Sequence, residues 1–161
     1  MPNIEIRLAT QADAPVIASV LEAAFEEYRS LYTDEGFAAT TPDSDHIQRR
    51  MLEGPIWIAL HASECVGTVS VVLRGEELYV RGMAVLPSAR GLHLGELLLK
   101  EVEDFALAHN CKYLILSTTP FLLRAIRLYE GSGFKRIAEG PHDLFGTPLF
   151  TMIKDLRKRL K

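Results

Sequence analysis

The segment PSARGLHLGELLLKEVEDFA (residues 87–106) decides the fold, because it places a glycine-containing loop directly before a strongly periodic apolar run. Apolar residues recur at helical spacing through its second half, which predicts an amphipathic helix that starts near Leu94 and stops at Asn110. Glu96 and Lys100 are four residues apart and are expected to pair on its exposed face. The helix therefore has one face for a core and one for water.

The loop in front of this helix contains Arg90 and two glycines, Gly91 and Gly95. A helix start leaves backbone N–H groups without partners and carries partial positive charge, and glycines let the backbone approach a ligand closely. The loop could therefore hold a phosphate or pyrophosphate group, with Arg90 as a further cation. It lacks the G-K-[ST] of a Walker A loop and the G-x-G-x-x-G fingerprint of dinucleotide sites. A plain turn into a helix explains the same glycines, so the loop alone leaves both interpretations open.

Apolar segments on both sides of this unit predict strands. The segments 55–60, 65–73 and 77–86 are joined by short connections, so they are expected to form antiparallel hairpins. The segment 112–118 follows the helix and is apolar throughout, which is typical of a strand covered on both faces and parallel to the strand before the helix. Further strands are predicted at 4–8, 134–139 and 149–156, and further helices at 16–28, 45–53 and 121–133.

This element order predicts an α/β (α+β) fold with a mixed six- to seven-stranded sheet and helices on both faces. Its fourth and fifth strands are parallel and flank the glycine loop and its helix. Gly82, inside the fourth strand, suits a bulge that splays the sheet. The length of 161 residues predicts a single domain, residues 1–161, and the stretch 32–45 is turn-rich and breaks the helical pattern.

Composition excludes several functional classes. Hydrophobic residues make up 48% of the chain and charged residues 24%, and a net charge of -3 offers no basic surplus for nucleic acid. The first residues show no signal-peptide pattern, no apolar run is long enough for a bilayer, and Cys65 and Cys111 have no C-x-x-C spacing. We therefore expect a cytoplasmic protein that binds neither nucleic acid nor membrane. The histidines and cysteines fit no metal-ligand spacing, so no metal is expected.

Two separated motifs resemble those of the GCN5-related N-acetyltransferase (GNAT) superfamily. RGLHLG (residues 90–95) is similar to its [R/Q]-x-x-G-x-[G/A] loop, and AIRLYEGSGF (residues 125–134) to its later Ala-x-x-Leu-Tyr-x-x-x-Gly-Phe motif. The opening IRLATQAD and the strand CVGTVSV also resemble that family, so the likeness covers nearly the whole chain. There are two departures. His93 occupies the position of the first loop glycine, and Leu122 stands where the later motif often has asparagine.

The resemblance implies an acetyl-CoA-dependent N-acetyltransferase that moves an acetyl group to a primary amine by direct attack. Acetyl-CoA would lie in a split between the fourth and fifth strands, with its pyrophosphate on the loop and its pantetheine arm along the fourth strand. The Met83 amide would polarise the thioester carbonyl, and Tyr129 matches the residue that protonates the departing thiolate. The acetyl-CoA-binding residues implied are Met83, Ala84, Val85, Arg90, Gly91, Leu92, His93, Leu94, Gly95 and Glu96.

The sequence gives fewer indications of the residues that bind and deprotonate the acceptor amine. Some relatives carry a glutamate base where this chain has Tyr79, so Glu35, Glu77, His61 or a chain of water molecules could take that role. The segments 29–45 and 140–148 are expected to flank the acceptor mouth. Their carboxylates and aromatic rings would suit a cationic amine; the residues are Tyr32, Asp34, Glu35, Phe37, His142, Asp143 and Phe145.

The expected partner is a small-molecule amine or a peptide amine. C-terminal strands of such folds often pair, which would give a homodimer, although the sequence itself does not show one. The alternative from another class is an acyl-CoA-binding sensor or interaction module without transferase activity. The missing carboxylate at Tyr79 and the changed loop residue His93 favour that alternative, whereas Tyr129 counts against it.

Overall fold

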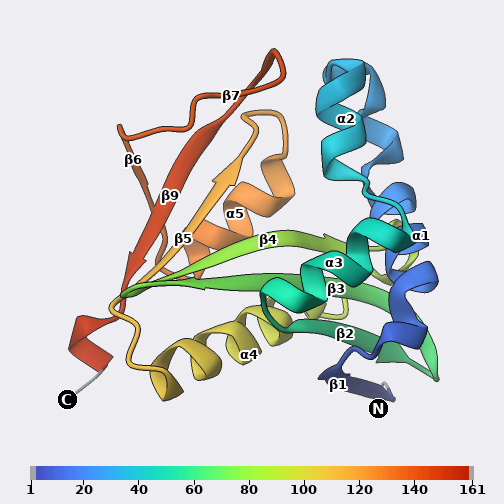
Figure 1. The fold of residues 1–161 in the computed structure, drawn as a ribbon, viewed down its shortest axis with the longest axis horizontal. Coiled ribbons are helices and arrows are strands. Elements are labelled where there is room, and N and C mark those ends of the chain that lie inside the picture. Colours follow the sequence, from blue (N-terminus) through green and yellow to red (C-terminus); the bar gives the residue numbers. More distant parts are fainter. Residues whose placement is uncertain (1–2, 160–161) are drawn as a thin grey trace.

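A seven-stranded mixed sheet with helices on both faces forms the centre of the computed structural model, which describes residues 3–159 (Figure 1). Residues 1–2 and 160–161 belong to the predicted domain but lie outside the described residues. Residues 1–2 are also the start of the segment that shows no signal-peptide pattern. In spatial order the strands are β1 (Ile4–Leu8), β2 (Ile56–His61), β3 (Glu64–Arg74), β4 (Glu77–Val85), β5 (Tyr113–Thr118), β9 (Phe150–Asp155) and β6 (Lys135–Ile137). The helices are α1 (Ala14–Phe25), α2 (Asp34–Thr40), α3 (Ser44–Glu53), α4 (Leu94–Ala108) and α5 (Leu123–Gly131).

Strand pairing confirms the predicted topology. Strands β1 to β4 form successive antiparallel pairs. Short connections dictate the pairs β2–β3 and β3–β4, whereas three α-helices lie between β1 and β2. The α4 crossover makes β5 parallel to β4, and β5 then pairs antiparallel with β9. The predicted mixed sheet with a parallel fourth and fifth strand is therefore correct.

Each face of the sheet has its own apolar core. On one face the buried side of α4, with Leu94, Leu98 and Val102 at helical spacing, packs on β3, β4 and β5 together with α5. On the other face α1 and α3 pack on β2, β3 and β4, with Ile17 and Ile47 almost fully buried. The sheet is thus held from both sides, which fixes the position of β4 in its middle.

Local side-chain contacts fix the start of α1, but one predicted side-chain pair on α4 does not form. The Asp13 carboxylate accepts hydrogen bonds from the Thr10 N–H (2.8 Å) and from the Arg7 guanidinium (2.9 Å), which fixes the start of α1. The predicted Glu96–Lys100 pair is wrong. Lys100 donates to Asp104, the carboxylate one turn further on, and Glu96 contacts the ring of His93.

The turn-rich stretch 32–45 contains a helix that the sequence did not predict. Thr33 caps α2 by accepting the Gly36 N–H, and Asp34 and Glu35 occupy its first turn. The loop between β6 and β9 contains a small hairpin of β7 (Asp143–Leu144) and β8 (Thr147–Pro148). No helix within residues 3–159 is long and apolar enough to cross a membrane.

Candidate functional site

Strands β4 and β5 diverge along their length (Figure 1), and a cleft lies where they part. The two strands pair only between Glu77–Tyr79 and Tyr113–Ile115. Beyond these positions β5 stays with β9 and β4 stays with β3, so the edge of β4 from residue 80 to 85 has no strand partner toward β5. A cleft of about 640 Å³ lies in this gap, lined by both strands, the loop before α4, and α5.

Gly82 explains why β4 bends at this point. The register between β3 and β4 shifts between Thr68 and Ser70, opposite Gly82. Gly82 has a φ of 62°, which glycine adopts at little cost. A Cβ at this position would lie 3.2 Å from Nη1 of Arg50. The bulge predicted at Gly82 is confirmed, and it turns β4 away from β5.

The loop before α4 presents unpaired backbone donors to the cleft. Within residues 3–159, the N–H groups of residues 91–96 donate to no backbone carbonyl, and they lie at the positive end of a 15-residue helix. Gly91 has a φ of 92°, and a Cβ there would meet no atom within 4 Å. Glycine is required at position 95 for a different reason. A Cβ there would lie 2.6 Å from Cδ2 of Leu128, so this glycine lets α4 pack closely on α5.

Two side chains of the loop, Arg90 and His93, pair with neighbouring carboxylates. Arg90 forms an ion pair with Glu27 of the 3-10 helix Glu26–Leu31. His93 adopts a left-handed conformation with a φ of 58°, its side chain is 81% exposed, and Nδ1 lies 2.6 Å from Oε2 of Glu96. The histidine in the glycine position therefore projects outward, and its backbone N–H remains available.

Tyr129 lies on α5 and lines the cleft. Its ring is buried and packs against Phe134, with 5.7 Å between the ring centroids. Burial raises the pKa of the Tyr129 hydroxyl, with a smaller contribution from Tyr32 nearby. The hydroxyl therefore keeps its proton at neutral pH and can act as a proton donor.

The predicted cofactor residues gather around this cleft with one exception. Leu92 packs against the apolar core beneath α4 and does not line the cleft. The other nine do so, on the open edge of β4 or on the loop; they are Met83, Ala84, Val85, Arg90, Gly91, His93, Leu94, Gly95 and Glu96.

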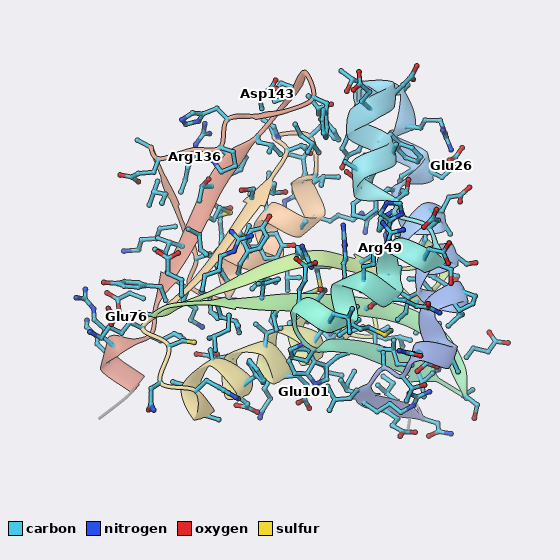
Figure 2. All side chains as sticks on the ribbon, viewed as in Figure 1. Glu26, Arg49, Glu76, Glu101, Arg136 and Asp143 are labelled. Atoms are coloured by element: carbon cyan, nitrogen blue, oxygen red, sulfur yellow. The ribbon has the colours of Figure 1, made fainter. Side chains whose placement is uncertain are left out.

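The two segments expected to flank the acceptor mouth do come together. The Thr33 N–H donates to Oγ1 of Thr147 (2.9 Å), and the Thr33 hydroxyl donates to the Phe145 carbonyl (2.8 Å). Of the side chains predicted to line the mouth, only Tyr32 lines the cleft, and its ring stands edge-on to Phe121 at 4.9 Å. The others do not line the cleft; they are Asp34, Glu35, Phe37, His142, Asp143 and Phe145. Figure 2 shows Asp143 on β7, near the upper edge of the molecule in this view.

The charged residues at this end of the cleft are arginines, not carboxylates. Arg50 of α3, Arg74 of β3 and Arg81 of β4 all line it. The only carboxylate that lines the cleft within residues 3–159 is Glu96, at the opposite, loop end. The carboxylates predicted for the acceptor mouth, Asp34, Glu35 and Asp143, therefore do not line this cleft. These arginines come from three separate elements. The one signal in the sequence was the alternation along β4, which puts Tyr79 and Arg81 on the same face of the strand.

None of the three side chains considered as a base, Glu35, Glu77 and His61, lines the cleft. Tyr79, at the position where some relatives have glutamate, lines it and stacks under the Arg74 guanidinium at 4.3 Å. The site therefore combines a proton donor, backbone donors for an anion and an open strand edge, without a carboxylate base among the described residues.

Comparisons with known proteins agree with this geometry. A family model described as "Acetyltransferase (GNAT) family" matches residues 17–134. The chain is 31% identical to the uncharacterized N-acetyltransferase YjgM of Escherichia coli K12, over 82% of each chain. It is 32% identical to the N-acetylaspartate synthetase of Danio rerio over 52% of this chain, a match that spans 30% of that protein. The PaiA N-acetyltransferase of Thermoplasma acidophilum, solved in complex with coenzyme A, superposes with a TM-score of 0.82 at 16% identity, over 95% of this chain and 99% of that one.

Proposed function

The chain belongs to the GNAT acetyltransferase family and is an acetyl-CoA-dependent N-acetyltransferase, and from this premise we propose that transfer takes place in the cleft between β4 and β5. The observation that carries the proposal is the loss of β4–β5 pairing beyond Tyr79. An extended arm can bind along the open edge of β4 as a further strand would. The parting of the strands leaves this edge on the wall of the cleft.

The residues around the cleft suit two parts of acetyl-CoA, its pyrophosphate and its pantetheine arm. The free N–H groups of residues 91–96 and the positive end of α4 would hold the pyrophosphate. Residues 83–85 would hold the pantetheine arm on the open edge of β4. The outward position of His93 leaves the backbone donors of the loop unobstructed. When bound, the thioester supplies an activated acetyl group.

Two groups of this chain would act on the reacting atoms. The Met83 N–H, next to the bulge at Gly82, would donate to the thioester carbonyl oxygen and stabilise the charge that develops there. The Tyr129 hydroxyl, which burial keeps protonated, would give its proton to the departing thiolate. The amine attacks the carbonyl carbon as the carbon–sulfur bond breaks. Since no side-chain carboxylate lines this end of the cleft among the described residues, the amine would lose its proton to water.

We propose a small primary amine as the acceptor, and the cytoplasm as the location. A relative that covers half of this chain is named N-acetylaspartate synthetase, which supports a small amine rather than a protein. The thiols of Cys65 and Cys111 are free, as expected for a protein kept in a reducing compartment.

Mass spectrometry of reaction mixtures tests this function. Purified protein is incubated with acetyl-CoA and a panel of amino acids, polyamines, aminoglycosides and peptides, with a protein-free mixture as control. Acetylated product above the control supports the proposal and identifies the acceptor class. Tight acetyl-CoA binding without product from any amine would instead favour a binding module.

A further inference from the structure

Three arginines meet at the acceptor end of the cleft. We call Arg50, Arg74 and Arg81 the arginine cluster. Glu53 lies among them: it is ion-paired with Arg81, and the charges of all three guanidinium groups help to lower its pKa. Glu53 is thus a carboxylate on which the charges of all three guanidinium groups act.

Arg50 is the least compensated member of the cluster. Within residues 3–159 no carboxylate lies within ion-pair distance of its guanidinium, although the side chain is half-buried. Burial and the neighbouring charge of Arg81 lower the pKa of Arg50, which means that the site disfavours this charge when it stands alone. Its Nη1 lies 3.2 Å from the point that a Cβ of Gly82 would occupy, so the guanidinium covers the bulge of β4.

Further hydrogen-bonding groups beside Arg50 have no partner. Arg81 donates to Oε1 of Glu53 through Nη2 (2.7 Å), but its buried Nε has no acceptor, and the buried Ser70 hydroxyl has no partner either. Ser70 Cβ lies 4.0 Å from the same Cβ position of Gly82 that Arg50 approaches. Buried polar groups are normally paired, so these donors indicate a missing acceptor.

We propose that the arginine cluster binds an oxyanion, a carboxylate or a phosphate, that the acceptor molecule carries beside its amine. This inference rests on the proposed function and names the substrate class. A guanidinium binds either oxyanion through two parallel N–H bonds. Gly82 directly precedes Met83, so an anion on Arg50 is held next to the proposed reacting carbonyl, and one small acceptor reaches both.

Matched amines test the inference through turnover. L-alanine is compared with L-alaninamide, and O-phosphoethanolamine with ethanolamine, with spermidine as a cationic amine. We expect kcat/KM of at least one anionic amine to exceed that of its neutral partner by about tenfold or more. The pair that shows the larger ratio identifies carboxylate or phosphate. Equal or faster acetylation of the neutral and cationic amines overturns the inference and leaves the transferase function intact.

Variants locate the effect. Arg50→Gln is expected to raise the acceptor KM about tenfold or more and leave the KM for acetyl-CoA unchanged, and Arg50→Lys to recover part of the loss. Arg49→Gln is the matched control, because Arg49 lies on the same helix (Figure 2), is exposed and does not line the cleft. A rise in the KM for acetyl-CoA alone would assign Arg50 to the donor and overturn the inference.

Calorimetry provides a readout that needs no turnover. Succinate and inorganic phosphate are titrated into the protein with coenzyme A present, for wild type, Arg50→Gln and Arg49→Gln. Binding of either anion that falls about tenfold in Arg50→Gln alone supports the anion site even if no amine is acetylated, which would refute only the proposed function. Absence of binding by both anions, or equal binding by all three proteins, overturns the inference.

Discussion

Replacing Tyr129 by phenylalanine separates chemistry from folding, because the substitution removes one hydroxyl and keeps the buried ring. Within the described residues that hydroxyl makes no hydrogen bond, so no native bond is lost and the ring contact with Phe134 remains. We expect the free energy of unfolding to change by less than about 0.5 kcal/mol. Removal of a general acid typically lowers the rate about 10²-fold or more, which corresponds to about 3 kcal/mol in the barrier.

The assay is steady-state detection of acetylated product, combined with urea unfolding of the same samples. For Tyr129→Phe, kcat should fall about 100-fold or more, while the KM for acetyl-CoA and the unfolding midpoint stay close to wild type. Tyr113→Phe serves as the control, because Tyr113 lies on β5 outside the cleft and should retain full kcat. Wild-type kcat in Tyr129→Phe would remove this hydroxyl from the mechanism. A large loss of stability would show that the hydroxyl has a structural partner.

Three further predictions concern pH, the loop and the sheet. The pKa of Asp13 is lowered chiefly by its hydrogen bond to Arg7, so the contribution of this carboxylate to stability is present above the ordinary aspartate pKa and is lost as pH falls. Asp13→Asn should therefore lower the free energy of unfolding by about 1 kcal/mol at pH 7 and by less at pH 3. Urea unfolding at both pH values measures this, and an equal loss at both would contradict it. His93→Gly should stabilise the protein by about 0.5 kcal/mol, because it relieves a left-handed backbone, and a lower melting temperature would count against that reason. Gly82→Val should lower the free energy of unfolding by about 2 kcal/mol, since a branched side chain in this conformation clashes with Arg50. It should also weaken acetyl-CoA binding in calorimetry. Unchanged affinity would show that the bulge at Gly82 does not shape the acetyl-CoA site.

The sheet was predictable because its strands are long enough to show their pattern and short loops dictate their pairing. The crossover through α4 then requires β5 to lie parallel to β4. Helix α2 was missed because its seven residues include Gly36 and are held by contacts distant in sequence, such as the one between Thr33 and Thr147. No local pattern contains that information. The pairing of Lys100 failed for a local reason, since carboxylates lie one helical turn away on both sides of it and it donates to Asp104 instead of Glu96.

The sequence predicted the loop residues that we propose for acetyl-CoA, but it did not predict the arginines that line the cleft. Residues 90–95 are contiguous, so one motif and one helix start describe them together. Arg50, Arg74 and Arg81 meet only after α3 has packed across the sheet, and each of them alone resembles an ordinary surface charge. The carboxylates predicted for the mouth lie in the correct segments, but α2 and the β7–β8 hairpin turn them away from the cleft.

The most direct test of the central claim is a titration of ¹⁵N-labelled protein with acetyl-CoA, followed by amide chemical shifts. Binding between β4 and β5 predicts that the amides of residues 91–96 and 83–85 shift most, while those of β1 and α3 remain in place. Saturable binding that shifts other amides and leaves both of these segments unchanged would contradict the account.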